Sequence, residues 1–127
     1  MTVEQIAPKD ILNQMQELIK RDGFAIHGYD AEDIAHVYTV GLSERLGAEL
    51  YVQFHVSNRK YPYIQILKNT ADVFMEQGSI TPGQRVFRQV FMNPISVSVV
   101  ELDLKSDQIQ NIKVRAGSFN RVFELQF

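Results

Sequence analysis

Two β-rich runs joined by a short polar segment constrain the fold of this chain more than any other feature. They cover residues 36–42 (HVYTVGL) and 48–55 (AELYVQFH), and residues 43–47 connect them. The first run is apolar on both of its alternating faces, which is typical of a strand inside a sheet. In the second run the polar face carries Tyr51, Gln53 and His55. We therefore expect a hairpin at the centre of an antiparallel sheet, with one face of its second strand open.

Two other stretches show the spacing of amphipathic helices. Residues 10–21 place an apolar stripe at intervals of three and four, and Gly23 follows as a terminator. The second helix is expected to begin at Ser57 or Asn58, to hold Pro62 near its first turn and to end at Gly78. Its expected core stripe is Ile64, Leu67, Ala71, Phe74 and Met75.

The remaining elements follow from β-rich runs and turn residues. We expect strands at residues 24–27, 85–91, 95–104 and 121–127, a polar loop at 28–33, turns at 81–83 and 93–94, and a short helix between Ser106 and Gly117. The apolar pattern changes face near Val99 or Val100, which predicts a β-bulge there.

This order lacks the regular strand–helix alternation of a doubly wound parallel fold. The predicted fold class is α+β, with a mainly antiparallel sheet, a central hairpin, and two long helices and one short helix packed on it. A chain of 127 residues suffices for one domain with its own core, and we expect a single domain over residues 1–127.

Composition narrows the classes of function. The net charge is −2 with both signs interspersed, which disfavours nucleic-acid binding. Cysteine is absent, so disulfides, thiolate nucleophiles and Cys-based zinc sites are excluded, and a cytoplasmic location is the expectation. No stretch has the length and apolarity of a signal peptide or a membrane span, and we expect no membrane association.

No catalytic or metal constellation is complete in the sequence. His36 and His55 flank the hairpin, but the nearest acid of the second run, Glu49, is expected at the opposite end of its strand. Ser43 and Ser57 lack the Gly-x-Ser-x-Gly elbow of serine hydrolases, and the glycines are isolated turn residues rather than a phosphate-binding loop. We predict no catalytic residue, no metal site and no cofactor.

The hairpin region resembles a known family. The residues that carry the resemblance are Gly23-Phe24-Ala25-Ile26, Tyr38-Thr39-Val40-Gly41-Leu42 and Gly47-Ala48-Glu49-Leu50. They are similar to the bacterial and phage domain-of-unknown-function family numbered 4262, although Phe24 replaces the family's usual Trp and the His-Pro that normally precedes the Glu is missing. The resemblance implies a small α+β domain of bacterial or mobile-element origin and implies no reaction.

Tyrosines and polar residues around the hairpin are the candidate binding residues, because tyrosine combines apolar area with a hydrogen-bonding tip. They are His27, Tyr29, Tyr38, Thr39, Ser43, Glu44, Arg45, Glu49, Tyr51, Gln53, His55 and Tyr61. The first hypothesis is a noncatalytic module that binds another protein, such as an immunity or anti-defence factor. The alternative is a small-molecule-binding protein or minor enzyme whose pocket is formed under the second helix by Tyr38, Thr39, Glu49, Tyr51 and His55.

Overall fold

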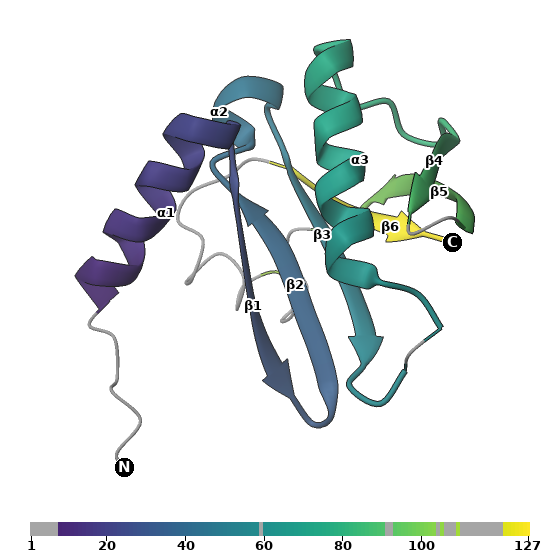
Figure 1. Cartoon of the computed structure of the whole chain (residues 1–127), viewed down its shortest axis with the longest axis horizontal. Coiled ribbons are helices and arrows are strands. Elements are labelled where there is room, and N and C mark those ends of the chain that lie inside the picture. Colours follow the sequence, from purple (N-terminus) through teal and green to yellow (C-terminus); the bar gives the residue numbers. More distant parts are fainter. Residues whose placement is uncertain (1–7, 59, 91–92, 104, 106–108, 110–120) are drawn as a thin grey trace.

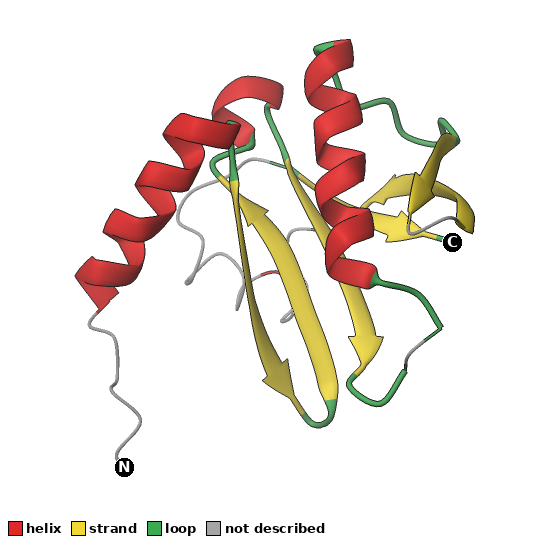
Figure 2. Cartoon of the chain, in the orientation of Figure 1, coloured by secondary structure: helices red, strands yellow, loops and turns green. Residues whose placement is uncertain are grey.

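In the part of the chain that the structure describes, six strands form one mixed, mostly antiparallel sheet in the order β1-β2-β3-β6-β5-β4 (Figures 1 and 2). The computed structural model describes residues 8–58, 60–90, 93–103, 105, 109 and 121–127. The strands are β1 (Ala25–Ala31), β2 (Ile34–Val40), β3 (Glu49–His55), β4 (Val86–Val90), β5 (Asn93–Glu101) and β6 (Val122–Gln126). The helices with defined bounds are α1 (Pro8–Asp22), α2 (Ser43–Leu46) and α3 (Tyr63–Gln77). The predicted α+β class is confirmed.

The central hairpin is confirmed. β2 pairs antiparallel with β3, with Tyr38 opposite Tyr51, and β1 pairs on the other side of β2. The connection between β2 and β3 holds the short helix α2, which ends at Gly47 in a left-handed conformation with φ of 77°. The short helix expected between Ser106 and Gly117 lies outside the described residues apart from Ile109, which is buried.

The loop expected at residues 28–33 is wrong for most of its length. β1 continues to Ala31, and the chain reverses in a two-residue turn at Glu32 and Asp33, whose φ angles are 53° and 66°. Positive φ at both central residues is the geometry of a type I′ hairpin turn, which usually recruits Asn and Gly. Glu32 is untypical of such a turn and Asp33 stands where Gly is preferred, so the sequence carries only a weak signal for this turn.

The two long helices end where the sequence predicts. Gly23 donates its backbone N–H to the carbonyl of Ile19 at 2.8 Å, and Gly78 caps α3 through Phe74 at the same distance. The expected start of α3 at Ser57 or Asn58 is wrong, since the helix begins at Tyr63 directly after Pro62. A proline disfavours helical geometry in the residue before it, so the helix starts after the ring rather than around it.

The C-terminal half of the sheet differs from expectation in two places. Asn93 and Pro94 do not form the turn but belong to β5, where Asn93 pairs with Val90 of β4. The predicted bulge is absent from the described pairs, because the register between β5 and β6 is unbroken from Ser98 to Glu101. β6 is the last strand of the chain, yet it lies between β3 and β5 and runs parallel to β3.

Two apolar clusters cover the two faces of the sheet, and they explain the change of face that suggested a bulge. α3 packs against β3 and β4 on one face, where the buried residues include Leu50, Val52, Leu67, Phe74, Val97, Val99 and Phe123. The other cluster, with α1, contains Met15, Ala25, Tyr38, Val40, Tyr51, Ile109 and Val122, with Leu102 packed against it. β5 and the residue after it supply both faces in turn, as an unbroken strand does.

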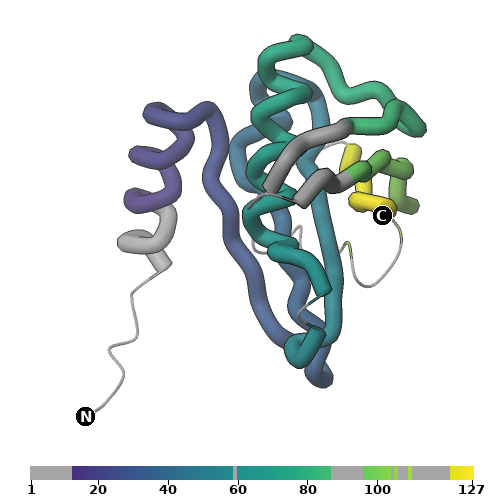
Figure 3. The backbone as a smooth tube through the Cα atoms, turned by 45° about the vertical axis from the view of Figure 1, so that its right-hand side comes forward, coloured from purple at the N-terminus to yellow at the C-terminus, as the bar shows by residue number. Residues whose placement is uncertain are grey.

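The helices do not reach the whole sheet. Figure 1 shows the β1–β2 turn and the end of β3 extending beyond the lower ends of α1 and α3, and Figure 3 shows the same from a second direction. We call this part of β1, β2 and β3 the open end of the sheet. Within the described part of the chain, no helix is long and apolar enough to cross a membrane.

Candidate functional site

The Glu49 carboxylate organises the α2 end of the central hairpin. One oxygen accepts hydrogen bonds from Thr39 Oγ1 at 2.8 Å and from the backbone N–H of Leu42 at 3.1 Å, and the other accepts the N–H of Ser43 at 3.0 Å. Thr39 Oγ1 in turn accepts the N–H of Leu50 at 2.8 Å. The carboxylate therefore takes up backbone donors that would otherwise lack partners where α2 begins. Thr39 and Glu49 link the end of β2, the start of α2 and the start of β3.

This carboxylate is buried, and burial has a measurable electrostatic consequence. Glu49 is 2% exposed. Desolvation raises the pKa of Glu49 above its ordinary value, and the hydrogen bonds from Ser43, Thr39 and Leu42 oppose that rise. Because each of these bonds is internal, Thr39 and Glu49 are committed to the architecture of the hairpin and are not exposed to a ligand.

On the face opposite α3, imidazoles and phenols alternate across the first three strands. The pattern His-x-Tyr occurs on β1 as His27 and Tyr29 and on β2 as His36 and Tyr38, and antiparallel pairing sets each His opposite a Tyr. His27 Nδ1 and the Tyr38 hydroxyl share a hydrogen bond of 2.8 Å. His36 Nδ1 and the Tyr51 hydroxyl share one of 2.5 Å, and Tyr29 stacks on His36 with ring centroids 4.9 Å apart.

Burial divides this network into two layers. Tyr38 and Tyr51 are fully buried, whereas His27, Tyr29 and His36 are half-buried. Desolvation lowers the pKa of His36, and the Asp30 carboxylate opposes this by raising it. The neutral imidazole is therefore favoured. The tyrosines orient the two histidines from within the sheet, and the half-buried rings form its accessible layer.

The polar face continues toward β6 and the end of β3. Gln53 donates to Glu124 at 3.1 Å, and burial raises the pKa of Glu124. His55 is exposed, and its Nδ1 accepts the backbone N–H of Ser57 at 3.2 Å and lies 2.7 Å from Ser57 Oγ. Ser57 and His55 are a hydroxyl–imidazole pair, but among the described residues no carboxylate is recorded as orienting this imidazole, as nucleophilic catalysis would require. The contact is a local turn motif.

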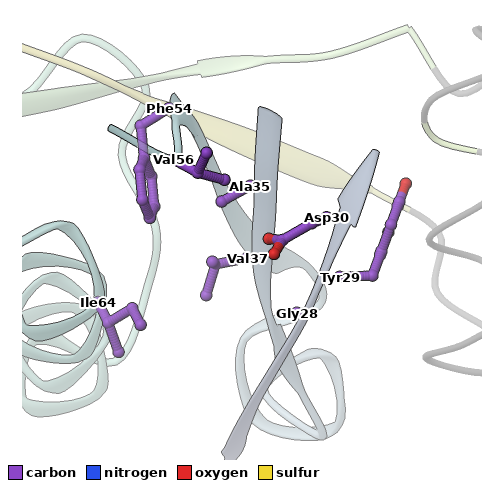
Figure 4. Close-up of a pocket in the computed structure, with 8 residues that line it drawn as sticks. All are labelled: Gly28, Tyr29, Asp30, Ala35, Val37, Phe54, Val56 and Ile64. Atoms are coloured by element: carbon purple, nitrogen blue, oxygen red, sulfur yellow. The ribbon is translucent and has the colours of Figure 1, made fainter. Parts of the chain in front are cut away.

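A hollow of about 360 Å³ opens on the other face, between the open end of the sheet and the start of α3 (Figure 4). It is lined by Gly28, Tyr29, Asp30, Ala35, Val37, Phe54, Val56 and Ile64. Figure 4 shows the Asp30 carboxylate directed toward the β2 side of the hollow, while the Tyr29 ring projects from the other side of β1. Asp30 is the one charged residue among the described residues that line it.

An aromatic cluster adjoins the hollow through Phe54. Phe54 stacks on Tyr63 with centroids 4.3 Å apart, and Tyr61 stacks on Phe127 at 4.9 Å. Ile64 and Phe127 are large apolar residues that remain 54% and 42% exposed. Ile64 does not belong to the buried stripe of α3, contrary to the sequence prediction, because the helix turns this position toward the hollow.

The sequence-predicted candidates thus lie in three places. The accessible polar face brings together His27, Tyr29, Gln53 and His55, with Tyr38 and Tyr51 buried beneath it. Ser43, Glu44 and Arg45 lie at α2, where Glu44 and Arg45 are exposed. Tyr61 belongs to the aromatic cluster. None of Tyr38, Thr39, Glu49, Tyr51 and His55, the residues of the expected pocket, lines this hollow, and the first four of them are buried.

Sequence reasoning missed the hollow, although a signal was present. Gly28 on β1 and Ala35 on β2 project to the same face as Val37 and Phe54, so a strip of small side chains crosses the sheet there. Small residues on a sheet face leave a depression in the surface where no helix packs over them, and this strip predicts the hollow.

No metal centre is found in the part of the chain that the structure describes, since no three side chains among His, Asp and Glu converge there. Comparisons with family models, with curated proteins and with solved structures yield no match.

Proposed function

We propose that this chain is a noncatalytic binding protein that contacts another protein through the open end of its sheet. The observation that supports this most is the distribution of burial. Thr39, Glu49, Tyr38 and Tyr51, which are the groups best suited to chemistry, are buried and bonded within the hairpin. The exposed groups are spread over an accessible polar face and an apolar hollow, as in a contact surface rather than an active site.

Both faces of the open end suit protein recognition. Tyr29 and His36 present stacked, half-buried rings that are already ordered, so little side-chain entropy is lost on binding. On the opposite face, Ile64 and Val56 offer apolar area beside the hollow. A partner that grips this end contacts aromatic and apolar area framed by polar groups, the usual composition of an interface centre and its rim.

The biological setting follows from the resemblance alone. We include in the proposal a bacterial or mobile-element origin, a cytoplasmic location and a role as an immunity or anti-defence factor. Such factors act by occupying a surface of another protein, which is compatible with a domain that has no catalytic constellation among its described residues.

Affinity purification from the native host, followed by mass spectrometry of the recovered proteins, tests the proposal. The bait is compared with Gln53→Lys and His55→Glu, which alter exposed positions of the open end, and with Asp103→Lys, an exposed position after β5. A specific partner should be lost with the first two changes and kept with the third. Retention of every recovered protein by all three variants would refute the assignment of the surface.

A second candidate function rests on the hollow. A volume of about 360 Å³ lies within the range of small-molecule sites, and the lining is mostly apolar with one carboxylate. Native mass spectrometry of the protein purified from its host would show an adduct of a small molecule if this alternative holds. Ile64→Lys should then abolish the adduct, whereas Val100→Lys, a matched change at an exposed apolar position of β5, should keep it.

A further inference from the structure

β1 is an edge strand whose outer backbone groups can be identified. Among the strands that the structure describes, it pairs with β2 alone, and Ala31 lies opposite Ile34 at the two-residue turn. In a hairpin of this type the closing pair exchanges both backbone hydrogen bonds, and the pairs alternate along the ladder from there. The N–H and C=O groups of Ala31 and Tyr29 therefore point to β2. Those of Asp30 and Gly28 point outward, away from the sheet.

The outward groups lie at an accessible stretch of the strand. α1 adjoins the Ala25 end of β1 and diverges from it, whereas the end near the turn extends beyond the helix (Figure 1). Gly28 and Asp30 are both exposed. Because Gly28 has no side chain, its exposure is exposure of its backbone. A row of accessible, unpaired donors and acceptors on an edge is a template for another strand.

The same two residues border the hollow. Positions 28 and 30 fall on the face of the sheet that carries Ala35 and Val37, and Ile64 of α3 lines the same hollow. A Cβ on Gly28 would lie 2.9 Å from the carbonyl oxygen of His36, so this position stays without a side chain and leaves the hollow open toward the edge. Asp30 supplies the one charge among the lining residues that the structure describes.

We propose that β1 accepts an added strand from another protein, and that this strand carries a large apolar side chain and a basic side chain two residues apart. The inference rests on the proposed function and specifies the partner. The strand bonds to the outward groups of Gly28 and Asp30. Its apolar side chain enters the hollow beside Gly28, and its basic side chain pairs with the Asp30 carboxylate, as directly opposed residues of neighbouring strands do.

Strand direction sets the order of the two side chains. An antiparallel strand reaches Asp30 before Gly28, so the basic residue precedes the apolar one in its sequence. A parallel strand has the reverse order. The residue between them falls on the opposite face, next to Tyr29.

The edge assignment is tested without any partner by two proline variants. Asp30→Pro removes an N–H that points outward and should keep the cooperative unfolding of the wild type, because proline is tolerated on the free side of an edge strand. Ala31→Pro removes an N–H that bonds to Ile34 and should lower the midpoint of urea unfolding. If Asp30→Pro were the more damaging of the two, the assignment of outward groups would be overturned.

Binding is tested by titrating the ¹⁵N-labelled protein with capped peptides and following its amide shifts. The probes are Ser-Thr-Lys-Thr-Leu-Thr-Ser, its reverse-order counterpart Ser-Thr-Leu-Thr-Lys-Thr-Ser, and a control with Glu in place of Lys. Saturable shifts at Gly28 and Asp30 are expected with one of the first two. Affinity should fall about tenfold or more with the Glu control and with Asp30→Asn, and it should vanish with Asp30→Pro. Asp103→Asn should bind as the wild type does.

Three results would overturn the proposal. They are the absence of saturable shifts with every peptide, equal binding by Asp30→Pro, and concentration-dependent shifts at the same amides without peptide, which would assign the edge to a second copy of the chain. The proposed function is tested separately. A partner from the host that is lost with His55→Glu but retained by Asp30→Pro would leave the binding surface in place and exclude strand addition.

Discussion

Glu49 shows how burial commits a carboxylate to structure. Glu49→Gln preserves the shape of the side chain but turns an amide group toward backbone donors that the carboxylate now accepts from Leu42 and Ser43. At least one buried donor then loses its acceptor. We expect the free energy of unfolding, measured with urea, to fall by about 1–3 kcal/mol. Glu44→Gln, at an exposed position of α2, is the control and should change it little.

The cost of Glu49→Gln should also depend on pH. The folded-state pKa of Glu49 is raised above its ordinary value of 4.5. Its contribution to stability is therefore fully present below that pH and is lost as pH rises through the folded pKa. The difference in free energy of unfolding between the wild type and Glu49→Gln should narrow as pH increases from about 4.5. A gap that widens over this range would contradict the burial of an ionisable carboxylate here.

His36 has the opposite dependence. Burial lowers its pKa below the ordinary 6.5, so its contribution to stability is present above that pH and is lost as pH falls through the folded pKa. Because the Asp30 carboxylate raises the pKa of His36, Asp30→Asn should lower it further. An NMR titration of the His36 ring protons measures this directly. The pKa should be unchanged in Asp103→Asn, and an unchanged value in Asp30→Asn as well would show that Asp30 does not act on His36.

At the scale of elements, Gly41 fixes where α1 packs. A Cβ at Gly41 would lie 2.7 Å from Ile19 Cδ1, and φ is 89°. Gly47 has a comparable φ of 77°, but no atom lies within 4 Å of the place where its Cβ would be. Both Gly→Ala changes store backbone strain of order 1–3 kcal/mol, and Gly41→Ala adds a steric clash. Thermal unfolding should show Gly41→Ala to be the less stable variant; equal stabilities would mean that Ile19 moves away without cost.

The β1–β2 turn is a second element whose sequence conflicts with its geometry. Glu32 and Asp33 both adopt positive φ, which costs a residue such as Glu about 1–2 kcal/mol and is less costly for Asp. The double change Glu32→Asn and Asp33→Gly supplies the residues that type I′ turns prefer. It should raise the free energy of unfolding by about 1 kcal/mol, measured with urea. The order reversed, Glu32→Gly and Asp33→Asn, tests whether Gly is needed at the second position in particular.

These elements show which parts of the structure could be predicted from sequence. Apolar residues on both faces of β2 and on one face of β3 predict the hairpin and its polar face, because side chains on a strand alternate with a period of two. Glycines predict the ends of α1 and α3 for an equally local reason. The type I′ turn and the late start of α3 escaped, since the first uses atypical residues and the second depends on Pro62.

The candidate site was predicted less well, because exposure depends on contacts between distant segments. Tyr38 and Tyr51 look like binding residues in the sequence but are buried in the sheet and bonded to His27 and His36. Ile64 looks like core in the sequence but borders the hollow. Residue type alone does not show which of these side chains are buried and which are exposed. Their exposure depends on how the helices pack against the sheet.

At the scale of the whole molecule, β6 connects the two halves of the sheet. It pairs parallel with β3 and antiparallel with β5, so β1, β2 and β3 are joined to β4 and β5 in one sheet only through β6. Pairing β6 with β3 closes a long loop of the chain, and this closure costs conformational entropy. Burial of the β6 side chains must offset that cost. The contribution of β6 to the free energy of unfolding should therefore come mainly from its buried residues.

Substitutions of two phenylalanines near the end of the described chain test this contribution to stability. Phe123 is 1% exposed in β6, whereas Phe127 is 42% exposed and stacks on Tyr61. Phe123→Ala should lower the free energy of unfolding by about 3–5 kcal/mol, because it removes a buried ring between the two halves. Phe127→Ala should lower it by about 1–2 kcal/mol, because it removes the aromatic pairs with Tyr61 and Tyr63 at a half-open position. Urea denaturation monitored by far-ultraviolet circular dichroism compares the two variants. If both lost the same amount, the sheet would not depend on the burial of β6 between β3 and β5.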